Sequence, residues 1–278
     1  MKDKSNYGIV FLSWKAPKTL EVSLKAISPL LDKEEISERV IYFQEIDKVD
    51  IALAESYGFR AEGNYKNRGI LQGMVSAVEH VKSDIVLYLE CDCLLLEEEK
   101  AAAKCLQQAS KALTRGEVDV MRLRHLQSPG IDYTAHKHLR YWPSLDQDDS
   151  YVKKTRRLLR PHKARRLIGE ACLVHTHPEL MFPNDIQNVN DKYYRMCSQV
   201  INWTNQSIMF RRDWFLHTLV PYAQKHPSSR TVNGFPDLEK ELNCNWWRKN
   251  KFKVGWANPG LFTHKRLDRP LNDEKVTL

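Results

Sequence analysis

The sequence contains no apolar run of eighteen residues, and its first residues, MKDKSNYG, lack the apolar core of a signal peptide. The first absence excludes an ordinary transmembrane helix, and the second favours a cytoplasmic, non-secreted protein. Cysteine pairs at CxxC spacing are also missing. The six cysteines are spread through apolar contexts, which indicates reduced, mostly buried thiols.

Two common phosphate-binding motifs are absent as well. No GxGxxG dinucleotide motif occurs, and GIVFLSWKAPKT near the N-terminus does not supply the Gly-rich, Lys-containing loop of a sugar nucleotidyltransferase. The first absence argues against a dinucleotide-dependent enzyme. The second weighs against a sugar nucleotidyltransferase, which stays an alternative because it would share the sheet and metal described below.

Positive charge is in excess, with a net charge of +8 over 278 residues, which favours anionic partners such as nucleotides, nucleic acid or an acidic membrane face. Much of the excess lies in Lys153 to Arg166, KKTRRLLRPHKARR, which holds eight Lys or Arg and no acid. This run is either a solvated basic face or a patch for an acceptor phosphate or peripheral membrane contact. A basic nucleic-acid-binding protein is a further alternative, which a steep loss of binding with added salt would identify.

Residues 1–125 alternate between apolar strand patterns and helical patterns. Strands separated by helices need crossover connections, which predicts an α/β, Rossmann-like fold with a mainly parallel sheet flanked by helices. Ligands of such sheets bind beyond the carboxyl ends of the strands. We expect strands at residues 7–13, 39–44, 59–61, 85–89 and 118–123, and helices at residues 19–31, 48–57, 69–81 and 97–113.

The second half of the chain is less regular. Residues 125–170 show no clear periodicity, which predicts a long insertion or a functional flap. Residues 200–210 read as a strand that runs into a helix over residues 212–224. Residues 235–250 read as one helix with Pro236 in its first turn and acids near its positive end.

A carboxylate pair, Glu90-Cys91-Asp92, ends the apolar strand DIVLYLECD. Such a pair after a buried strand is costly unless a cation neutralises it or water reaches it. Oxygen ligands of this kind suit Mg²⁺ or Mn²⁺, which proteins hold through one or two carboxylates together with substrate phosphates. The same triplet is equally typical of an exposed turn before a helix with an acidic start.

The segment from Asn67 to Asp92, NRGILQGMVSAVEHVKSDIVLYLECD, resembles nucleotide-sugar-dependent glycosyltransferases with the GT-A fold, of the family 2 type. In that family an Asn-x-Gly opens a helix, an Asp precedes a hydrophobic strand, and the strand ends in a metal-binding DxD motif. The matching residues here are Asn67, Gly69, Asp84 and Glu90-Cys91-Asp92. The first acid of the triplet departs from the motif because it is Glu, so it could contact ribose or water instead of the ion.

The resemblance implies a Mn²⁺ or Mg²⁺ ion held by Asp92 and by a late histidine, here His264 in NPGLFTHKRLDR. Lys265, Arg266 and Arg269 beside it could meet the oxygens of a diphosphate. The donor site implied by the resemblance comprises Ser13, Trp14, Lys15, Asn67, Gly69, Glu90 and Arg266.

An inverting transfer needs a general base, because the acceptor hydroxyl loses a proton as it attacks. The family takes this base from an acid in a late helix, and PDLEKELNCNWWRKNKFKVG resembles that region without an adjacent Glu-Asp pair. The candidates are Asp237, Glu239 and Glu241. Helical spacing predicts that Asp237 and Glu241 share one face and that Glu239 points elsewhere. Asp237 also fits a dipole-complementing role, so Glu239 and Glu241 are the better candidates, and the choice between them stays open.

The resemblance thus implies a metal-dependent glycosyltransferase, inverting, that moves a sugar from a nucleotide-sugar donor to a carbohydrate or lipid-linked glycan acceptor, as in polysaccharide biosynthesis. Residues 1–125 would bind the donor, and residues 126–278, continuous with them, would bind the acceptor and carry the base. Nucleic acid is not the partner we expect.

Two further groups leave alternatives open. Aromatic and amide side chains could form an acceptor surface or belong to the core, namely Trp203, Asn205, Gln206, Trp246 and Trp247. His175 and His177 would share one face of a strand. No third and fourth ligands at recognisable spacing accompany them, which weighs against a zinc site.

Overall fold

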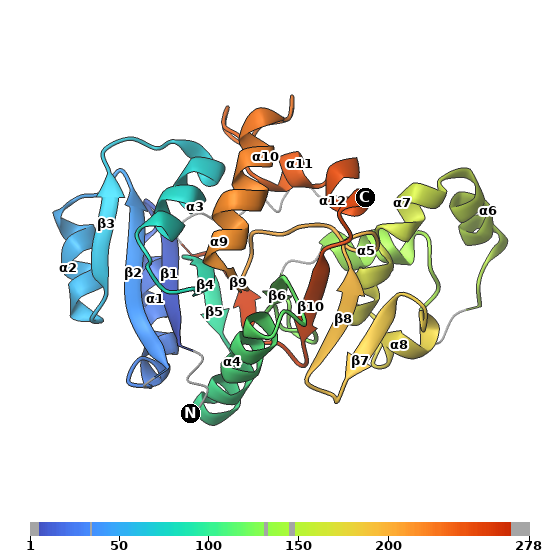
Figure 1. The fold of residues 1–278 in the computed structure, drawn as a ribbon, viewed down its shortest axis with the longest axis horizontal. Helices are drawn as coiled ribbons and strands as arrows, with labels where there is room; N and C mark the ends of the chain where they lie inside the picture. Colours follow the sequence, from blue (N-terminus) through green and yellow to red (C-terminus); the bar gives the residue numbers. More distant parts are fainter. Residues whose placement is uncertain (1–5, 34, 131–132, 145–147, 268–278) are drawn as a thin grey trace.

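The computed structural model describes residues 6–33, 35–130, 133–144 and 148–267, and its centre is a nine-stranded sheet with helices on both faces (Figure 1). The strand order is β3-β2-β1-β4-β9-β6-β10-β8-β7. β9 and β8 run antiparallel to their neighbours and the other strands share one direction, which confirms the predicted mainly parallel α/β sheet. The strands are β1 (Tyr7–Trp14), β2 (Ile36–Gln44), β3 (Arg60–Asn64), β4 (Ile85–Glu90), β6 (Val120–Arg122), β7 (Ile186–Val189), β8 (Tyr193–Cys197), β9 (Ile208–Arg211) and β10 (Lys253–Ala257), and β5 (Cys93–Leu95) pairs separately with β11 (Phe262–His264).

The helices vary in length, and a π-helical turn, Phe215–Leu219, joins α9 to α10. No helix in the described part of the chain is both long and apolar enough to span a bilayer. The helices are α1 (Pro17–Ile27), α2 (Lys48–Ser56), α3 (Gly69–Glu79), α4 (Glu99–Thr114), α5 (Tyr133–Leu139), α6 (Tyr151–Leu159), α7 (Pro161–Arg165), α8 (Pro178–Met181), α9 (Arg212–Trp214), α10 (Val220–Lys225), α11 (Glu239–Leu242) and α12 (Asn245–Lys249), with 3₁₀ turns at Ser28–Leu30 and Ile168–Leu173.

The central strands are apolar at nearly every position because both faces of the sheet are covered. In β1, Ile9 and Phe11 belong to the core layer that contains α1 and α4, whereas Val10 and Leu12 belong to the layer that contains α3. Successive side chains of a strand point to opposite faces, so a strand covered on both sides needs apolar residues at consecutive positions. This explains why an uninterrupted apolar run identified the strand.

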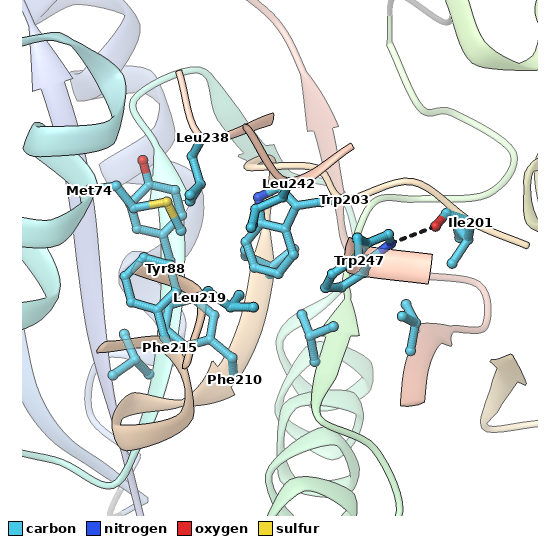
Figure 2. Close-up of a cluster of buried hydrophobic side chains, with 14 of the residues drawn as sticks. Met74, Tyr88, Ile201, Trp203, Phe210, Phe215, Leu219, Leu238, Leu242 and Trp247 are labelled. Carbon is cyan, nitrogen blue, oxygen red and sulfur yellow. Dashed lines mark hydrogen bonds between the residues drawn. The ribbon is translucent and has the colours of Figure 1, made fainter. Parts of the chain in front are cut away.

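Large aromatic side chains fill the core layer on the α3 side, which Figure 2 shows in close-up. Phe210 stacks on Phe215 with ring centroids 4.7 Å apart, and Trp247 is fully buried. The indole Nε1 of Trp247 donates to the carbonyl of Ile201 at 2.9 Å, so its one polar group is satisfied (Figure 2). Burial of each such side chain stabilises the fold by about 2–3 kcal/mol.

The strand predicted over residues 200–210 is shorter in the structure, where β9 occupies only its end. The preceding residues bond to side chains of a later segment. The backbone N–H of Trp203 donates to Asn243 Oδ1 at 2.7 Å, and that of Asn205 donates to Glu239 Oε1 at 3.0 Å. Side-chain acceptors therefore replace a neighbouring strand, and local sequence does not reveal partners so distant along the chain.

The single helix predicted over residues 235–250 is also wrong, since two short helices, α11 and α12, occupy this stretch. Leu238 has a φ of +68°, which is incompatible with a continuous helix through it. Asp237 lies before the first helix, and its Oδ1 accepts from the N–H of Lys240 at 2.8 Å. Asp237 and Glu241 consequently do not share a helix face.

Residues 125–170, predicted as a long insertion or a functional flap, contain α5, α6 and α7. Helices α6 and α7 lie at the end of the molecule beyond β8 and β7, opposite the end formed by α2 and β3 (Figure 1). No residue of α6 is buried. The apolar residues of α6, Tyr151, Val152, Leu158 and Leu159, have the spacing of one helical stripe, but all four are exposed, so this stripe does not face the core.

Candidate functional site

The carboxyl ends of β1, β2 and β4 meet at one edge of the sheet. Their register pairs Leu12 with Glu90 and Trp14 with Gln44. A cavity of about 340 Å³ lies at this edge, within the size range of small-molecule sites. Both halves of the chain contribute lining residues, among them Ser13, Trp14, Gln44, Asn67, Gly69, Glu90, Asp92, Asn205, Gln206, Asp237, Glu239, His264 and Arg266.

A two-stranded ribbon carries the C-terminal histidine to the acidic turn. β5 follows Asp92 directly and pairs antiparallel with β11, which places His264 opposite Cys93. The N–H of Lys265 donates to the carbonyl of Asp92 at 2.8 Å. As a result, His264 Nε2 lies 3.0 Å from Asp92 Oδ2.

Three potential metal ligands converge at this point. One ligand atom each from Glu90, Asp92 and His264 lies within 4.8 Å of the others. Asp92 is only 2% exposed, and its Oδ1 has no hydrogen-bond partner among the described residues. A buried carboxylate oxygen without a partner is costly, so the donor set fits a divalent cation.

Burial and charge act in opposite directions on the ionisable groups of this cluster. Burial and the neighbouring charge of Asp92 raise the pKa of Glu90 to about 8. Burial alone would raise the pKa of Asp92, but the hydrogen bond to His264 and the charges of His264 and Arg266 lower it. Two carboxyl groups with pKa values pushed apart are typical of a functional site.

The entrance to α3 forms one wall of the cavity. Gln44 Oε1 accepts from the N–H of Arg68 at 2.8 Å, and Asn67 Oδ1 accepts from the N–H of Gly69 at 2.8 Å. Gly69 has a φ of +83°, and a Cβ there would lie 2.2 Å from Cβ of Phe235. Glycine therefore allows the loop that carries Phe235 to close against α3.

The three candidate bases occupy different surroundings. Glu239 lines the cavity, and burial raises its pKa. Asp237 also lines it, but Lys240 Nζ lies 2.8 Å from its Oδ2. Glu241 is not a lining residue, and its Oε1 accepts from the N–H of Ser228 at 3.1 Å.

Several residues that the sequence analysis assigned to the site do not line this cavity. Lys15 is not among the lining residues and pairs with Glu45. Arg269 lies outside the described residues. Trp246 stacks on Tyr222 with ring centroids 4.0 Å apart.

Trp203 and Trp247 belong to the core (Figure 2). Of the predicted acceptor surface, Asn205 and Gln206 are the members that line the cavity. Gln44 was missed by the sequence analysis, although its position at the end of a predicted strand could have identified it.

His175 and His177 do not lie on a strand, contrary to the expectation, because a 3₁₀ turn precedes them and α8 follows. His175 is buried with its ring centroid 5.6 Å from that of His138. His177 is solvent-exposed, with its Nδ1 3.3 Å from Glu179 Oε1. The two imidazoles therefore have different surroundings.

Comparison with known proteins finds similarity in structure and none in sequence. No protein-family model and no curated protein matches the chain. S. aureus TarS 1-349 in complex with UDP-GlcNAc matches over 98% of this chain and 62% of that one, with a TM-score of 0.51 and 8% identity. Glucosyl-3-phosphoglycerate synthase from Mycobacterium tuberculosis, in complex with Mn²⁺, UDP and glucosyl-3-phosphoglycerate, matches over 97% of this chain and 74% of that one, with a TM-score of 0.51 and 12% identity.

Some of these similar proteins are considerably longer. The match spans 60% of the TarS 1-349 chain and 36% of a longer TarS chain. At identities this low the likeness establishes the fold alone. The chain therefore has the GT-A fold that the resemblance in its sequence implied.

Proposed function

We propose that this GT-A chain is a metal-dependent, inverting glycosyltransferase that moves a sugar from a nucleotide-sugar donor to a carbohydrate or lipid-linked glycan acceptor. The observation that carries the proposal is the convergence of Asp92, His264 and Glu90 in the cavity that Glu239 also lines. The UDP-GlcNAc in the similar TarS structure, and the Mn²⁺ and UDP in the similar synthase structure, support this reading.

The donor would lie at the carboxyl edge of the sheet, against Ser13, Trp14, Asn67 and Gly69. Arg266 Nε lies 3.7 Å from Asp92 Oδ2, so its guanidinium could also reach diphosphate oxygens next to the acids. Lys15 is not assigned to the donor, because it pairs with Glu45 outside the cavity lining.

Asp92, His264 and Glu90 would hold the cation. Two carboxylates with one imidazole suit Mn²⁺, and the carboxylates alone also suit Mg²⁺. When bound there, the cation would stabilise the negative charge that develops on the departing nucleoside diphosphate. Glu90 could instead face the ribose, which leaves Asp92 and His264 as the ligands most closely paired in the structure.

Glu239 is the proposed base. The N–H of Asn205 holds its carboxylate through Oε1, and its raised pKa makes it a better proton acceptor than an ordinary carboxylate. The acceptor hydroxyl would give its proton to Glu239 while the hydroxyl oxygen forms a bond to the anomeric carbon of the sugar. The bond from that carbon to the diphosphate breaks, and its electron pair leaves with the diphosphate.

The two halves of the chain would have different roles in binding and catalysis. Residues 1–125 supply the proposed donor contacts, and residues 126–278 supply the proposed base together with Asn205 and Gln206 on the acceptor side. His264 and Arg266 come from the second half, so the cation and diphosphate site needs both.

A thermal-shift screen tests the proposal. Nucleoside diphosphates and nucleotide sugars should raise the melting temperature only when Mn²⁺ is present, because ligands that bind the native state stabilise it by mass action. Formation of a glycosylated product with the stabilising donor would follow. The absence of a shift with every nucleotide would contradict the proposal, and salt-sensitive nucleic-acid binding would favour the alternative.

A further inference from the structure

A second cavity, about 720 Å³ in volume, lies where α5, α6 and α7 meet the backbone at Asn202. No acidic residue is among the described residues that line it. Two other large cavities of the molecule have acids in their walls, Glu179 and Asp185 in one, Glu38 and Asp84 in the other. The cationic lining residues of the α5–α7 cavity are Lys137, Arg140, Arg156, Arg160, Lys163 and Arg166.

The charges of this cationic cavity are not neutralised within the described part of the chain, where none of these six side chains forms an ion pair with a carboxylate. Two acids that contact α6 and α7 pair with cations that do not line the cavity. Asp149 pairs with Arg157, and Asp185 lies 3.6 Å from Arg165. Arg166 Nε is buried and has no hydrogen-bond partner in the described structure.

A further cation, Arg248, contacts the lining of the cavity. Arg248 donates to Asn202 Oδ1 at 3.0 Å, and burial together with the charge of Arg166 lowers the pKa of Arg248. Like charges in a concave site repel one another and attract anions from solution. A bound anion would relieve this repulsion.

The cavity walls are held by contacts that do not use most of these cations. Arg157 donates to the carbonyl of Tyr141 at 2.6 Å, and Trp142 Nε1 donates to the carbonyl of Ala164 at 3.2 Å. His138 Nδ1 lies 2.8 Å from the carbonyl of Leu167. The cationic side chains are consequently available to a ligand.

We propose that this cationic cavity binds phosphate groups, as an anion site separate from the proposed diphosphate site at Asp92. Guanidinium groups bind phosphate oxygens through paired hydrogen bonds, and four of the six cations are arginines. The unpartnered Nε of Arg166 supplies a buried donor for such an oxygen. The volume of the cavity accommodates a phosphate together with the groups that it esterifies.

The position of the cavity assigns this phosphate to the acceptor, an assignment that rests on the proposed function. Asn202 lines the cationic cavity, and Asn205, three residues later, lines the cavity that holds the candidate base. Their Cα atoms are at most about 11 Å apart, because an extended chain advances no more than about 3.6 Å per residue. An acceptor with its phosphate in one cavity could therefore present a hydroxyl to the other.

The phosphate could come from a soluble phosphorylated glycan or from a lipid headgroup. Next to the cationic cavity, α6 exposes Tyr151 and Leu158, whose side chains are 83% and 81% accessible. Apolar side chains beside a cationic cluster are typical of segments that lie on anionic membranes. The test therefore includes both sources.

Calorimetric titration with inorganic pyrophosphate, in EDTA and without nucleotide, tests the site itself. The wild-type protein should bind pyrophosphate. Arg160→Ala/Lys163→Ala should weaken this binding by at least about tenfold, because the loss of one hydrogen bond between charged groups already lowers affinity by about that factor. Lys100→Ala/Lys104→Ala on α4 removes the same charge from an exposed surface and should leave binding unchanged. Absence of binding, or equal weakening in both double variants, would overturn the proposal.

Sedimentation with vesicles of phosphatidylglycerol and phosphatidylcholine distinguishes the sources. If a lipid supplies the phosphate, the protein should sediment with the vesicles. Tyr151→Ser/Leu158→Ser should then abolish sedimentation with the vesicles and leave the affinity for pyrophosphate unchanged. Pyrophosphate binding without vesicle binding would assign the site to a soluble phosphorylated acceptor. The nucleotide and Mn²⁺ thermal shift is measured separately, so failure of the proposed function and failure of this site are distinguishable.

Discussion

His264 Nε2 lies 3.0 Å from Asp92 Oδ2, although the two residues are far apart along the chain. The β5–β11 ribbon, outside the nine-stranded sheet, creates this contact. Asp92 is fixed by the end of β4 and His264 by its register with Cys93, so the spacing of the two side chains depends on one short pairing. A cation site of this kind is sensitive to changes in either strand.

Asp92→Asn removes the charge at the centre of the proposed cation site and keeps the shape of the side chain. We expect loss of the Mn²⁺-dependent rise in melting temperature with nucleoside diphosphates, and a fall in transfer of at least about 10²-fold, because a metal ion contributes several kcal/mol to charge stabilisation. Asp213→Asn, at an exposed aspartate on α9, is the matched control. Mn²⁺-dependent stabilisation that survives in Asp92→Asn would refute the metal assignment.

Glu239→Gln should reduce turnover by about 10²- to 10⁴-fold with little change in donor affinity, because a general base acts on the acceptor proton. Glu241→Gln is the internal comparison, since its carboxylate accepts from Ser228 outside the cavity lining. Steady-state kinetics and donor binding would be measured for both. Equal and mild effects on turnover would point to another base or to a retaining reaction.

Gly69→Ala and Gly234→Ala separate backbone strain from steric conflict. Both glycines have a φ near +84°, but a Cβ at Gly234 meets nothing within 4 Å, whereas one at Gly69 meets Phe235. We expect Gly234→Ala to cost about 1 kcal/mol in the free energy of unfolding and Gly69→Ala about 2–4 kcal/mol. Urea unfolding measures this difference.

Gly69→Ala should also weaken nucleotide binding, because Phe235 lines the proposed donor cavity. Similar behaviour of the two variants would mean that the contact with Phe235 has no importance for the site.

Acid should destabilise the protein through His138. Burial lowers the pKa of His138 to about 4. The hydrogen bond to the carbonyl of Leu167 acts in the opposite direction, whereas His175 and Lys153 lower the pKa further. Well above pH 6.5 the imidazole is neutral in both the folded and the unfolded state. Between about pH 6.5 and pH 4 the unfolded chain binds a proton that the folded chain does not, so stability falls as pH falls, by up to roughly 3 kcal/mol.

Urea unfolding at a series of pH values measures this slope. His138→Asn keeps a donor for the carbonyl of Leu167 and removes the titrating ring, so its stability should depend less on pH over this range. His136→Asn, at an exposed histidine of the same helix, should keep the wild-type slope. An unchanged slope in His138→Asn would show that other groups cause the acid sensitivity.

The strands in the first part of the chain were predictable from their apolar runs, whereas β7, β8 and β10 of the same sheet were not predicted. β1 and β4 are buried on both faces, so their apolar runs and the acids that end β4 locate the edge of the sheet from sequence alone. The approach of His264 to Asp92 was implied by family resemblance. No local pattern reveals it, because the pairing of β5 with β11 joins residues far apart along the chain.

The arrangement of the candidate bases could not be predicted from helical spacing. Because Leu238 has a positive φ, Asp237 and Glu239 line the same cavity and Glu241 does not. Helical spacing had predicted instead that Asp237 and Glu241 lie together. The hydrogen bond from Asn205 to Glu239 belongs to the same rearrangement. The cause is tertiary, since leucine has no intrinsic preference for this backbone conformation.

The ribbon that joins β5 to β11 also fixes when the cation site is completed. During synthesis, Asp92 leaves the ribosome long before His264, so the nascent polypeptide can form β1 to β4 while half of the ligand pair is still missing. Contacts between residues so distant in sequence form late in folding, because the intervening chain must first be ordered. A polypeptide released early, before residue 262, would keep the acidic turn without its imidazole.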